Sequence, residues 1–453
     1  MKWWQSSLFL LLAASAFAQS DRSQITGTVF DPAGAVVGNV TIQARNIDTG
    51  SEFQAVSTAT GNYALLELPV GQYQLRATSA GFKTYIRDGF GVQAGQVYRI
   101  DIPLEVGAAS ESVTVTAEAP LLNTESGELA KNVTSAALNQ LPVLGIGSAF
   151  SSNSGVRQPL AVTALIPGGI FVGDNVIRLN GTPSNTQSIR VEGQDSTNYL
   201  WVNAVSQNQP SVDAIEEFQV QTSNYAAEFG KAGGGVFLVT MKSGTNKYHG
   251  TAYDYLVNEA LNATTPYTNA KPRARRNDYG FTFGGPADIP KLYDGHDKTF
   301  YFFNFEQFRE ITNINDTRII VPTNAYRLGD FTQALTTRSA TVNGVTYREG
   351  TIFDPASQAN GRRTAFVNNA IPAARMDPVA VAVQNLIPKA TNSAIINNYQ
   401  PSFAADRKTD ITSLKLDQNM GSKGKISGYY SMTRTRSDTS TVLGAEGLPD
   451  PIS

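Results

Sequence analysis

The sequence contains no cysteine and only two histidines, His249 and His296, among 453 residues. The absence of cysteine excludes a disulfide framework and a thiolate metal site. The two histidines stand far apart in the chain, which argues against a histidine-rich metal or catalytic centre. Lys and Arg total 36 and Asp and Glu total 38, so the basic excess typical of nucleic-acid binding is missing. We therefore expect no metal, no cofactor and no nucleic-acid partner.

Catalytic motifs are also missing. The stretch "GKAGGG" at residues 230–235 suggests a phosphate-binding loop, but it lacks the spacing G-x-x-x-x-G-K-[ST] and precedes a strand-like run instead of a helix. Glu216 and Glu217 are adjacent and so point to opposite faces of a strand, which leaves a glycosidase pair unsupported. The Asp and Asn residues at 313–316 lack the spacing of an EF-hand loop. The sequence therefore predicts that the chain is not an enzyme.

Long apolar runs are confined to the N-terminus. Lys2 precedes the apolar stretch "LFLLLAASAFA", which ends in the small-x-small pattern Ala16-Phe17-Ala18. This arrangement predicts a cleaved signal peptide at residues 1–18, with an uncleaved anchor as the alternative. No later segment is apolar over the roughly 18 residues that a membrane helix needs. We expect an exported protein that can enter a membrane only as β-structure.

Residues 19–108 show the pattern of a small β-sandwich. Val40, Ile42 and Ala44 alternate with polar residues, and so do Tyr73 and Leu75 further along. Turn-forming residues recur between these runs, as in "DPAG" and "PVG". Frequent turns over a stretch of about this length suit an immunoglobulin-like all-β sandwich.

The sandwich segment resembles a known family. "GTVFDPAGAVVGNVTIQ", "TGNYALLELPVGQYQLRATSAGF" and "LEVGAASESVTVTAEAP" are similar to the carboxypeptidase-regulatory-like domain, which has the carbohydrate-binding-like fold and precedes some outer-membrane receptors. The family name does not imply peptidase activity here. No histidine precedes His249, so this segment has no zinc-peptidase ligand set.

Residues 109–123 form an expected linker around the short β-prone run "ESVTVTA". One interpretation is a last sandwich strand or a plain linker. The other is a detachable edge strand, whose unpaired backbone groups are a template for strand addition by a partner. The run resembles the TonB box of TonB-dependent receptors, and this resemblance implies contact with TonB by Glu111, Ser112, Val113, Thr114, Val115, Thr116 and Ala117.

Residues 124–246 mix short helices and strands and resemble the plug domain of these receptors. The similarity lies in Arg178 with "NG" at 180–181, "VEG" at 191–193, "EEFQV" at 216–220 and "GGGVFLVT" at 233–240. The family's usual "DG" is "EG" at Glu192. The resemblance implies structural roles for Arg178, Gly181, Gly193, Gly233, Gly234 and Gly235.

The same resemblance implies an outward-facing loop that contacts ligand, with Tyr199, Trp201, Asn203 and Asn208. Exposed aromatic rings beside amides suit contact with a sugar or a peptide. The alternative is that the two aromatic rings pack against a barrel wall.

From residue 247 to 453 the pattern becomes period two and aromatic. Phe281 and Phe283 share one face, opposite Asp278 and Thr282. Alternating aromatic strands of about ten residues are typical of a transmembrane barrel, with a soluble sheet as the alternative. We expect strands near 250–259, 277–284, 298–308, 411–420 and 425–436, and a long extracellular loop at 309–410 that resembles the loop of Oar-like receptors.

Five strands cannot close a barrel. Bacterial barrels need at least about eight strands, and an open edge leaves unpaired backbone groups in lipid. We therefore expect this mainly β chain to be the N-terminal part of a longer receptor: a sandwich, an α/β plug and the first barrel strands.

The leading functional hypothesis is a TonB-dependent outer-membrane receptor that takes up a large ligand. The resemblance implies outer-membrane lipid, TonB with its inner-membrane motor complex, and a ligand such as an oligosaccharide, peptide or siderophore as partners. The alternative is an exported carbohydrate-binding or adhesion module without transport activity.

Overall fold

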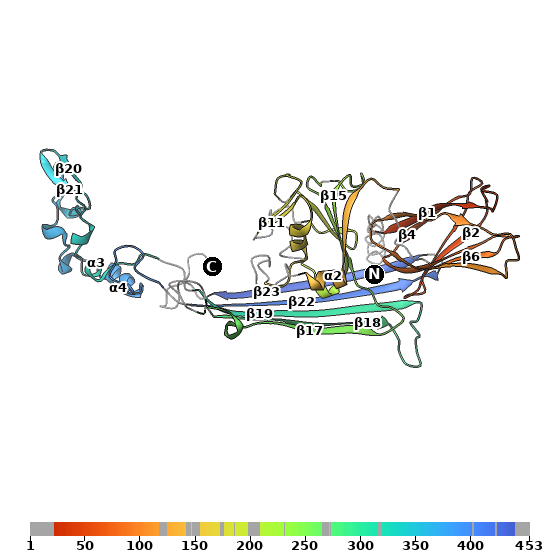
Figure 1. Ribbon diagram of the computed structural model, residues 1–453. Helices are drawn as coiled ribbons and strands as arrows, with labels where there is room; N and C mark the ends of the chain where they lie inside the picture. Colours follow the sequence, from red (N-terminus) through yellow and green to blue (C-terminus); the bar gives the residue numbers. More distant parts are fainter. Residues whose placement is uncertain are drawn as a thin grey trace, which may run out of the picture. The chain divides into compact units, whose positions relative to one another are not determined.

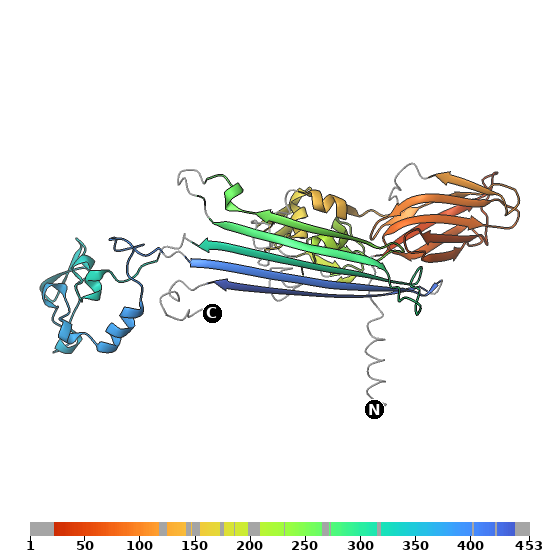
Figure 2. The same ribbon diagram turned by 90° about the horizontal axis from the view of Figure 1, so that it is seen from below.

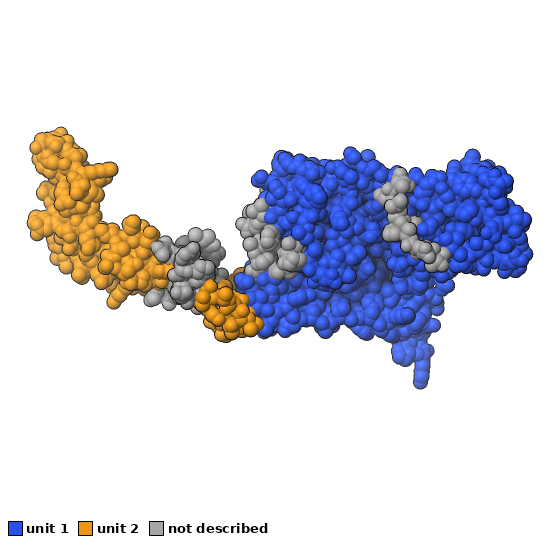
Figure 3. Space-filling model, in the orientation of Figure 1, with its two compact units in different colours: residues 1–257, 276–310, 407–436 blue, residues 258–275, 311–406, 437–453 orange. Residues whose placement is uncertain are grey.

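The computed structural model describes residues 22–116, 125–141, 146, 155–172, 176–184, 186–197, 209–230, 232–264, 271, 273–314, 319–400, 403–421 and 424–439. The chain divides into two compact units (Figure 3). Unit 1 comprises Met1–Val257, Arg276–Glu310 and Arg407–Arg436, and unit 2 comprises Asn258–Arg275, Ile311–Asp406 and Ser437–Ser453. Among the described helices, none is both long and apolar enough to cross a membrane.

The N-terminal part of unit 1 is a two-sheet β-sandwich, as predicted. The alternating residues form its core, with Ile42, Tyr73 and Leu75 fully buried. One sheet has the order β4-β1-β7, with β8 beside β1, and the other has the order β3-β2-β5-β6-β9. The strands are β1 (Ser23–Phe30), β2 (Thr41–Asn46), β3 (Glu52–Val56), β4 (Asn62–Leu68), β5 (Gly71–Thr78), β6 (Thr84–Val92), β7 (Val97–Arg99), β8 (Ile102–Pro103) and β9 (Ser112–Thr116).

The sheet that follows the sandwich in the chain, here called the central sheet, has the order β10-β15-β16-β13-β14. Its apolar core is built around Phe218 and Phe237, whose ring centroids lie 5.9 Å apart. The strands are β10 (Leu129–Thr134), β13 (Ser188–Val191), β14 (Gln194–Asp195), β15 (Ile215–Ser223) and β16 (Val236–Met241); β11 (Gly169–Val172) and β12 (Val176–Leu179) form a separate pair. Helix α2 (Ser135–Gln140) and the 3₁₀ turns η1 (Pro159–Leu165) and η2 (Val212–Ala214) flank these strands.

Another five-stranded sheet, here called the long-strand sheet, has the order β17-β18-β19-β22-β23 (Figure 2). Its strands are β17 (His249–Val257), β18 (Ala274–Pro286), β19 (Thr299–Ile314), β22 (Phe403–Asn419) and β23 (Lys425–Thr439). Several strands are longer than predicted, because pairing continues through polar residues beyond the aromatic stretches. Strands β17 and β23 form the two edges, so the barrel is not closed.

The two faces of the long-strand sheet differ as the alternation predicted. Phe281 and Phe283 are about half exposed on the outer face, where the rings of Phe281 and Phe303 lie 5.8 Å apart. On the inner face Asp278 and Glu306 are almost fully buried. The central sheet lies against this inner face (Figure 1). An aromatic outer face and a polar inner face are typical of strands in an outer-membrane barrel.

Unit 2 is an ordered loop structure, and its described residues form no large apolar core. Arg327 donates hydrogen bonds to the carbonyls of Gln384, Ile387 and Pro388 at 2.7, 2.8 and 2.6 Å. Hydrogen bonds from side chains to the backbone thus hold this loop in place. Its described elements are α3 (Asn324–Arg327), α4 (Pro378–Leu386), the pair β20 (Ser339–Val342) and β21 (Val345–Arg348), and the 3₁₀ turns η3 (Glu259–Leu261), η4 (Thr332–Ala334), η5 (Pro355–Ser357), η6 (Val367–Asn369) and η7 (Ala373–Arg375).

Candidate functional site

The predicted partner-binding run forms strand β9 at the edge of the sandwich. β9 pairs in parallel with the first half of β6, with Val113 opposite Tyr85. β9 is therefore the last strand of the sandwich, and it also lies at the edge of its sheet. The Thr84 N–H donates to Glu111 O at 2.8 Å, and the Thr84 hydroxyl donates to Ala109 O at 2.9 Å. Ala117 lies outside the described residues.

Strand β9 contributes little to the sandwich core. Val113 is half-buried, Val115 is 39% exposed, and neither belongs to the apolar cluster of the sandwich. Backbone hydrogen bonds, more than apolar packing, hold the strand on β6. A strand held in this way can separate without opening the core, and its outer edge is available for strand addition.

The three glycines before β16 lie against another loop. The N–H groups of Gly233 and Gly234 both donate to Thr186 O, at 2.7 and 3.2 Å. A Cβ atom on Gly234 would lie 2.6 Å from Thr186 Oγ1 and 2.8 Å from Thr182 Oγ1. Gly235 has a φ of 118°, and a Cβ there would lie 2.8 Å from Gln221 O. Side chains at these positions would therefore displace the loop at 182–186 or the backbone of β15.

Two further predicted positions are turn residues. Gly181 follows Asn180, and both have positive φ values, 76° and 50°. Glu192 and Gly193, with φ values of 52° and 77°, form the two-residue turn between β13 and β14. A turn of this type suits a tight hairpin and favours glycine at its second position. Arg178 is exposed on β12, and its Nε donates to Ser184 Oγ at 2.7 Å.

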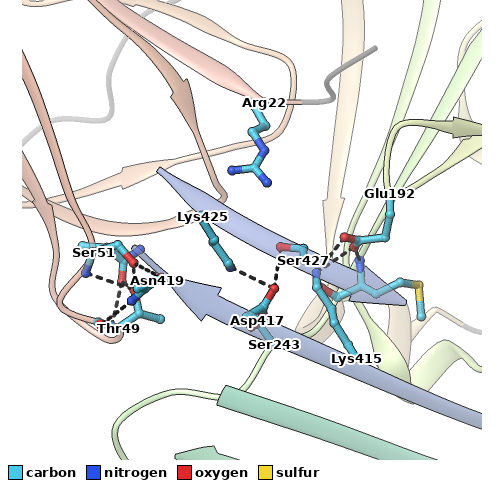
Figure 4. Close-up of polar contacts among 12 residues, drawn as sticks. Arg22, Thr49, Ser51, Glu192, Ser243, Lys415, Asp417, Asn419, Lys425 and Ser427 are labelled. Carbon is cyan, nitrogen blue, oxygen red and sulfur yellow. Dashed lines mark hydrogen bonds and ion pairs between the residues drawn. The ribbon is translucent and has the colours of Figure 1, made fainter. Parts of the chain in front are cut away.

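The glutamate in this turn makes a contact that the sequence did not reveal. Glu192 Oε1 accepts the Met241 N–H at 2.6 Å, and Glu192 Oε2 lies 2.8 Å from the Nζ of Lys415 on β22 (Figure 4). Lys415 Nζ also donates to Met241 O at 3.0 Å. The additional methylene of glutamate, compared with aspartate, reaches the end of β16. The departure from the family's "DG" thus coincides with a link between the central and long-strand sheets.

A second link joins the segment after β16 to the same strand. Asp417 on β22 is buried and accepts a hydrogen bond from Ser243 Oγ (Figure 4). Its other oxygen accepts from Ser427 Oγ at 2.6 Å and pairs with Lys425 Nζ at 3.2 Å. The chain leaving β16 is therefore tied to both β22 and β23.

A buried cluster of charged groups forms a third link. Arg157, beside η1, pairs with Asp213 and lies 3.8 Å from a carboxylate oxygen of Asp278 on β18. Its guanidinium carbon also lies 4.2 Å from the ring centroid of Tyr255. Glu306 on β19 completes the cluster, and all four side chains belong to residues that are at least 95% buried. Buried charges require partners, so separating the two sheets here would be costly.

The sandwich touches the long-strand sheet as well. Ser51 Oγ donates to Asn419 Oδ1 at 2.9 Å, and Asn419 Nδ2 donates to Thr49 O at 3.3 Å (Figure 4).

A cavity of about 300 Å³ lies nearby, where sandwich turns face the end of β16, and it is lined in part by Lys242 and Lys415. Burial lowers the pKa of Lys242.

The turn between β18 and β19 holds one group of potential metal ligands that the sequence did not suggest. Ligand atoms of Asp288, Asp294 and His296 lie within 4.8 Å of one another. Asp288 Oδ1 already accepts the Gly295 N–H at 2.9 Å, and Asp294 Oδ1 accepts the His296 N–H at 3.1 Å. The latter bond holds the pKa of Asp294 below its ordinary value. These hydrogen bonds explain the cluster as the framework of a solvent-exposed turn.

The proposed ligand-facing loop lies outside the described residues, as does the predicted signal peptide at 1–18. The roles of Tyr199, Trp201, Asn203 and Asn208 therefore remain predictions.

Two family models match parts of the chain. Residues 24–105 match the carboxypeptidase regulatory-like domain, and residues 240–451 match the outer membrane beta barrel domain. The chain thus combines a regulatory-like sandwich with outer-membrane barrel strands, and its predicted outer-membrane location is confirmed. A curated relative is the TonB-dependent transporter Oar of Myxococcus xanthus, which is 29% identical over 298 residues. The predicted resemblance to an Oar-like TonB-dependent receptor is confirmed.

The match covers 63% of this chain and 27% of Oar, so the chain spans about a quarter of its curated relative. Because that relative is a transporter, the prediction that the chain is not an enzyme is also confirmed. Two solved structures with low overall similarity are the siderophore receptor PirA from Acinetobacter baumannii and the ferric yersiniabactin uptake receptor FyuA from Yersinia pestis. Their TM-scores are 0.30 and 0.31, at 15% and 9% sequence identity. The two matches cover 68% and 69% of this chain, and 40% and 41% of the respective receptor chains.

Proposed function

We propose that this chain is the N-terminal portion of a TonB-dependent outer-membrane receptor that takes up a large ligand. The observation that carries the proposal is β9, an edge strand that backbone pairing holds on the sandwich and that precedes the central sheet in the chain. The similarity to the transporter Oar supports it. In this proposal residues 19–108 are the sandwich, 109–123 the linker, 124–246 the plug, and 247–453 the first barrel strands. The extracellular loop predicted at 309–410 is shorter, because β19 continues to Ile314 and β22 begins at Phe403.

The proposed mechanism begins on the outside of the cell. A ligand such as an oligosaccharide, peptide or siderophore binds the loop that carries Tyr199, Trp201, Asn203 and Asn208 and favours one of two plug states. Differential binding to the two states supplies the free energy that shifts the plug. TonB then adds to β9 as a strand and, driven by its inner-membrane motor complex, pulls on the plug.

The contacts between the sheets fit this mechanism. A plug that moves must separate Glu192 from Lys415 and Ser243 from Asp417, which together join it to β22. The glycines at 233–235 would permit this movement next to a strand that stays in place. These contacts would hold the plug closed until force arrives through β9.

The test is a deletion of residues 111–117 in the complete receptor. Binding of the purified periplasmic domain of TonB to the detergent-solubilised receptor should be lost, while the barrel remains folded. The control replaces Val113 and Val115 by Thr, which keeps the β-propensity and the backbone donors. Undiminished TonB binding by the deletion variant would contradict the proposal and favour an exported carbohydrate-binding or adhesion module.

A further inference from the structure

The turn at residues 93–96, between β6 and β7, is seated on the central sheet. Ala94 in this turn is 1% exposed. Its N–H donates to Glu217 Oε2 at 2.8 Å, and its carbonyl accepts from Gln219 Nε2 at 2.8 Å. Both partners belong to β15 and are themselves buried. One residue of the sandwich thus has both of its backbone groups bound by the central sheet.

The alternation along β15 explains how this seat arises. Phe218 and Val220 pack into the apolar core on one face of the strand. Glu217, Gln219 and Gln221 form a polar row on the opposite face, where Gln221 Nε2 donates to Gln219 Oε1 at 2.9 Å. Buried polar groups need hydrogen-bond partners, and the backbone of the 93–96 turn supplies two of them.

The same turn also reaches β10, the neighbour of β15. The Oε1 atom of Gln93 accepts a hydrogen bond from Asn132 Nδ2 at 3.0 Å. Gln96 Nε2 donates to Glu128 Oε1, just before β10, at 3.3 Å. Asn132 stands directly opposite Gln219 in the ladder between β10 and β15. The turn therefore contacts both members of one cross-strand pair.

The sandwich holds this turn rigidly from its own side. The Gln93 N–H donates to the Tyr98 hydroxyl at 3.1 Å, and the Gln96 N–H donates to Ser23 Oγ at 3.3 Å. Gly95 has a φ of 64°, and a Cβ there would lie 3.0 Å from Gln219 Oε1. A rigid turn with a glycine at its tip can approach β15 closely.

The place of this contact in the chain gives it a mechanical role. β10 is an edge strand of the central sheet and the next strand after β9, so a pull on β9 reaches β10 before any other part of that sheet. We propose that the 93–96 turn is a clip that holds β10 on β15 and sets the resistance of the central sheet to peeling. Only the source of the pull rests on the proposed function; the clip itself does not.

A proline substitution can remove the central hydrogen bond without altering the turn. Ala94 and Gly95 occupy the middle of the turn, and a positive φ at its second central position suits a type II turn, which favours proline at the first. Ala94→Pro removes the N–H that Glu217 accepts. A matched control exists at residues 79–82, "SAGF", where Gly81 has a φ of 84° and Ala80 is exposed. Ala80→Pro makes the same change in a turn away from the central sheet.

The measurement is amide hydrogen exchange of residues 129–134 in the complete receptor, folded in outer-membrane vesicles. Ala94→Pro should accelerate this exchange by about tenfold or more, as expected for losing a hydrogen bond to a charged acceptor. Ala80→Pro should leave it unchanged. Unchanged exchange in Ala94→Pro, or equal acceleration by both variants, would overturn the clip.

A second set of variants keeps the test decisive if a proline variant does not fold. Glu217→Ala should accelerate the exchange of β10, Glu217→Gln should restore protection because its amide oxygen still accepts, and Glu216→Ala, on the opposite face, should have no effect. Equal exchange in Glu217→Ala and Glu217→Gln would contradict the proposal. None of these measurements involves TonB, so loss of TonB binding by the 111–117 deletion and loss of β10 protection are separate outcomes.

Discussion

Glu192 and Lys415 form an ion pair of 2.8 Å between the β13–β14 turn and β22, although 223 positions separate them in the sequence. The pair joins the central sheet to the long-strand sheet where β16 ends. Glu192 also accepts the Met241 N–H, so its carboxylate serves two partners. Its length is therefore as important as its charge.

Glu192→Asp should weaken the attachment of the central sheet. The shorter side chain cannot reach both Met241 and Lys415, and leaving one buried partner unsatisfied costs about 1–3 kcal/mol. We expect faster hydrogen exchange of residues 236–241 in Glu192→Asp. Glu216→Asp, which shortens an exposed glutamate of the same sheet, is the control and should leave the exchange unchanged. Equal protection in both variants would show that the reach of Glu192 is unimportant.

Arg157→Met should be among the most destabilising single substitutions. It leaves the buried Asp213 without the cation it pairs with, a change that typically costs about 3–5 kcal/mol. Thermal unfolding of the complete receptor in outer-membrane vesicles would measure the loss. The double variant Arg157→Met with Asp213→Leu should recover part of the stability, because it removes a charge that the first change left unpaired. No recovery would mean that Arg157 acts mainly through its packing on Tyr255.

Much of the fold could be predicted because alternation reports which face is buried. The period-two pattern placed Phe281 and Phe283 on one face of β18 and Asp278 on the other, as the structure has them. The boundaries of the long strands could not be predicted, since pairing continues where the aromatic pattern stops.

The contacts between sheets could not be predicted from local patterns. Arg157 and Asp213 are 56 positions apart, and neither belongs to a periodic run that indicates its partner. The only signal was the presence of charges at inward positions of β18 and β19. The polar row on β15 that binds Ala94 was only weakly indicated, by the alternation of Glu217, Gln219 and Gln221 with apolar residues. Nothing in the sequence identified the 93–96 turn as the partner of this row.

Gly234→Val should disturb the start of β16. Even the Cβ atom would lie within 3 Å of two threonine hydroxyls, so the loop at 182–186 would have to move. In the complete receptor we expect increased sensitivity to a large antibiotic that normally cannot cross the outer membrane. Gly230→Val is the control, because a Cβ at Gly230 meets no atom within 4 Å and its φ is not positive. An impermeable and fully active Gly234→Val receptor would show that the glycines only form a tolerant turn.

Glu128 should make the attachment of β10 depend on pH. Burial, and secondarily the charge of Glu228, raise the pKa of Glu128 in the folded chain above its ordinary value of 4.5. The folded state therefore binds this proton more tightly than the unfolded state. The contribution of Glu128 to the free energy of unfolding is greatest below pH 4.5 and is lost as the pH rises through the folded pKa. Glu128→Gln should remove this dependence and increase the protection of residues 129–134 at pH 7.

The control for Glu128 is Glu125→Gln. Glu125 lies near Arg99 on the surface, and its replacement should not abolish the pH dependence. Exchange rates at pH 5 and pH 7, corrected for the intrinsic effect of pH on amide exchange, would compare the variants. A pH dependence of the Glu128→Gln variant as large as that of the parent chain would assign the titration to another group.

Arg327→Met should loosen unit 2 without affecting the sheets. The guanidinium donates to three carbonyls at the end of α4, and Gln384 Nε2 donates back to Arg327 O at 3.0 Å. Methionine has a similar length but no donors, so these carbonyls lose their partners. None of the residues of α4 is buried, so these hydrogen bonds are its main attachment among the described residues. We expect chymotrypsin to cleave residues 319–400 more rapidly in this variant, while Arg363→Met, at an exposed position of the same loop, should be cleaved like the parent chain. Equal cleavage of Arg327→Met and Arg363→Met would show that contacts other than those of Arg327 order the loop.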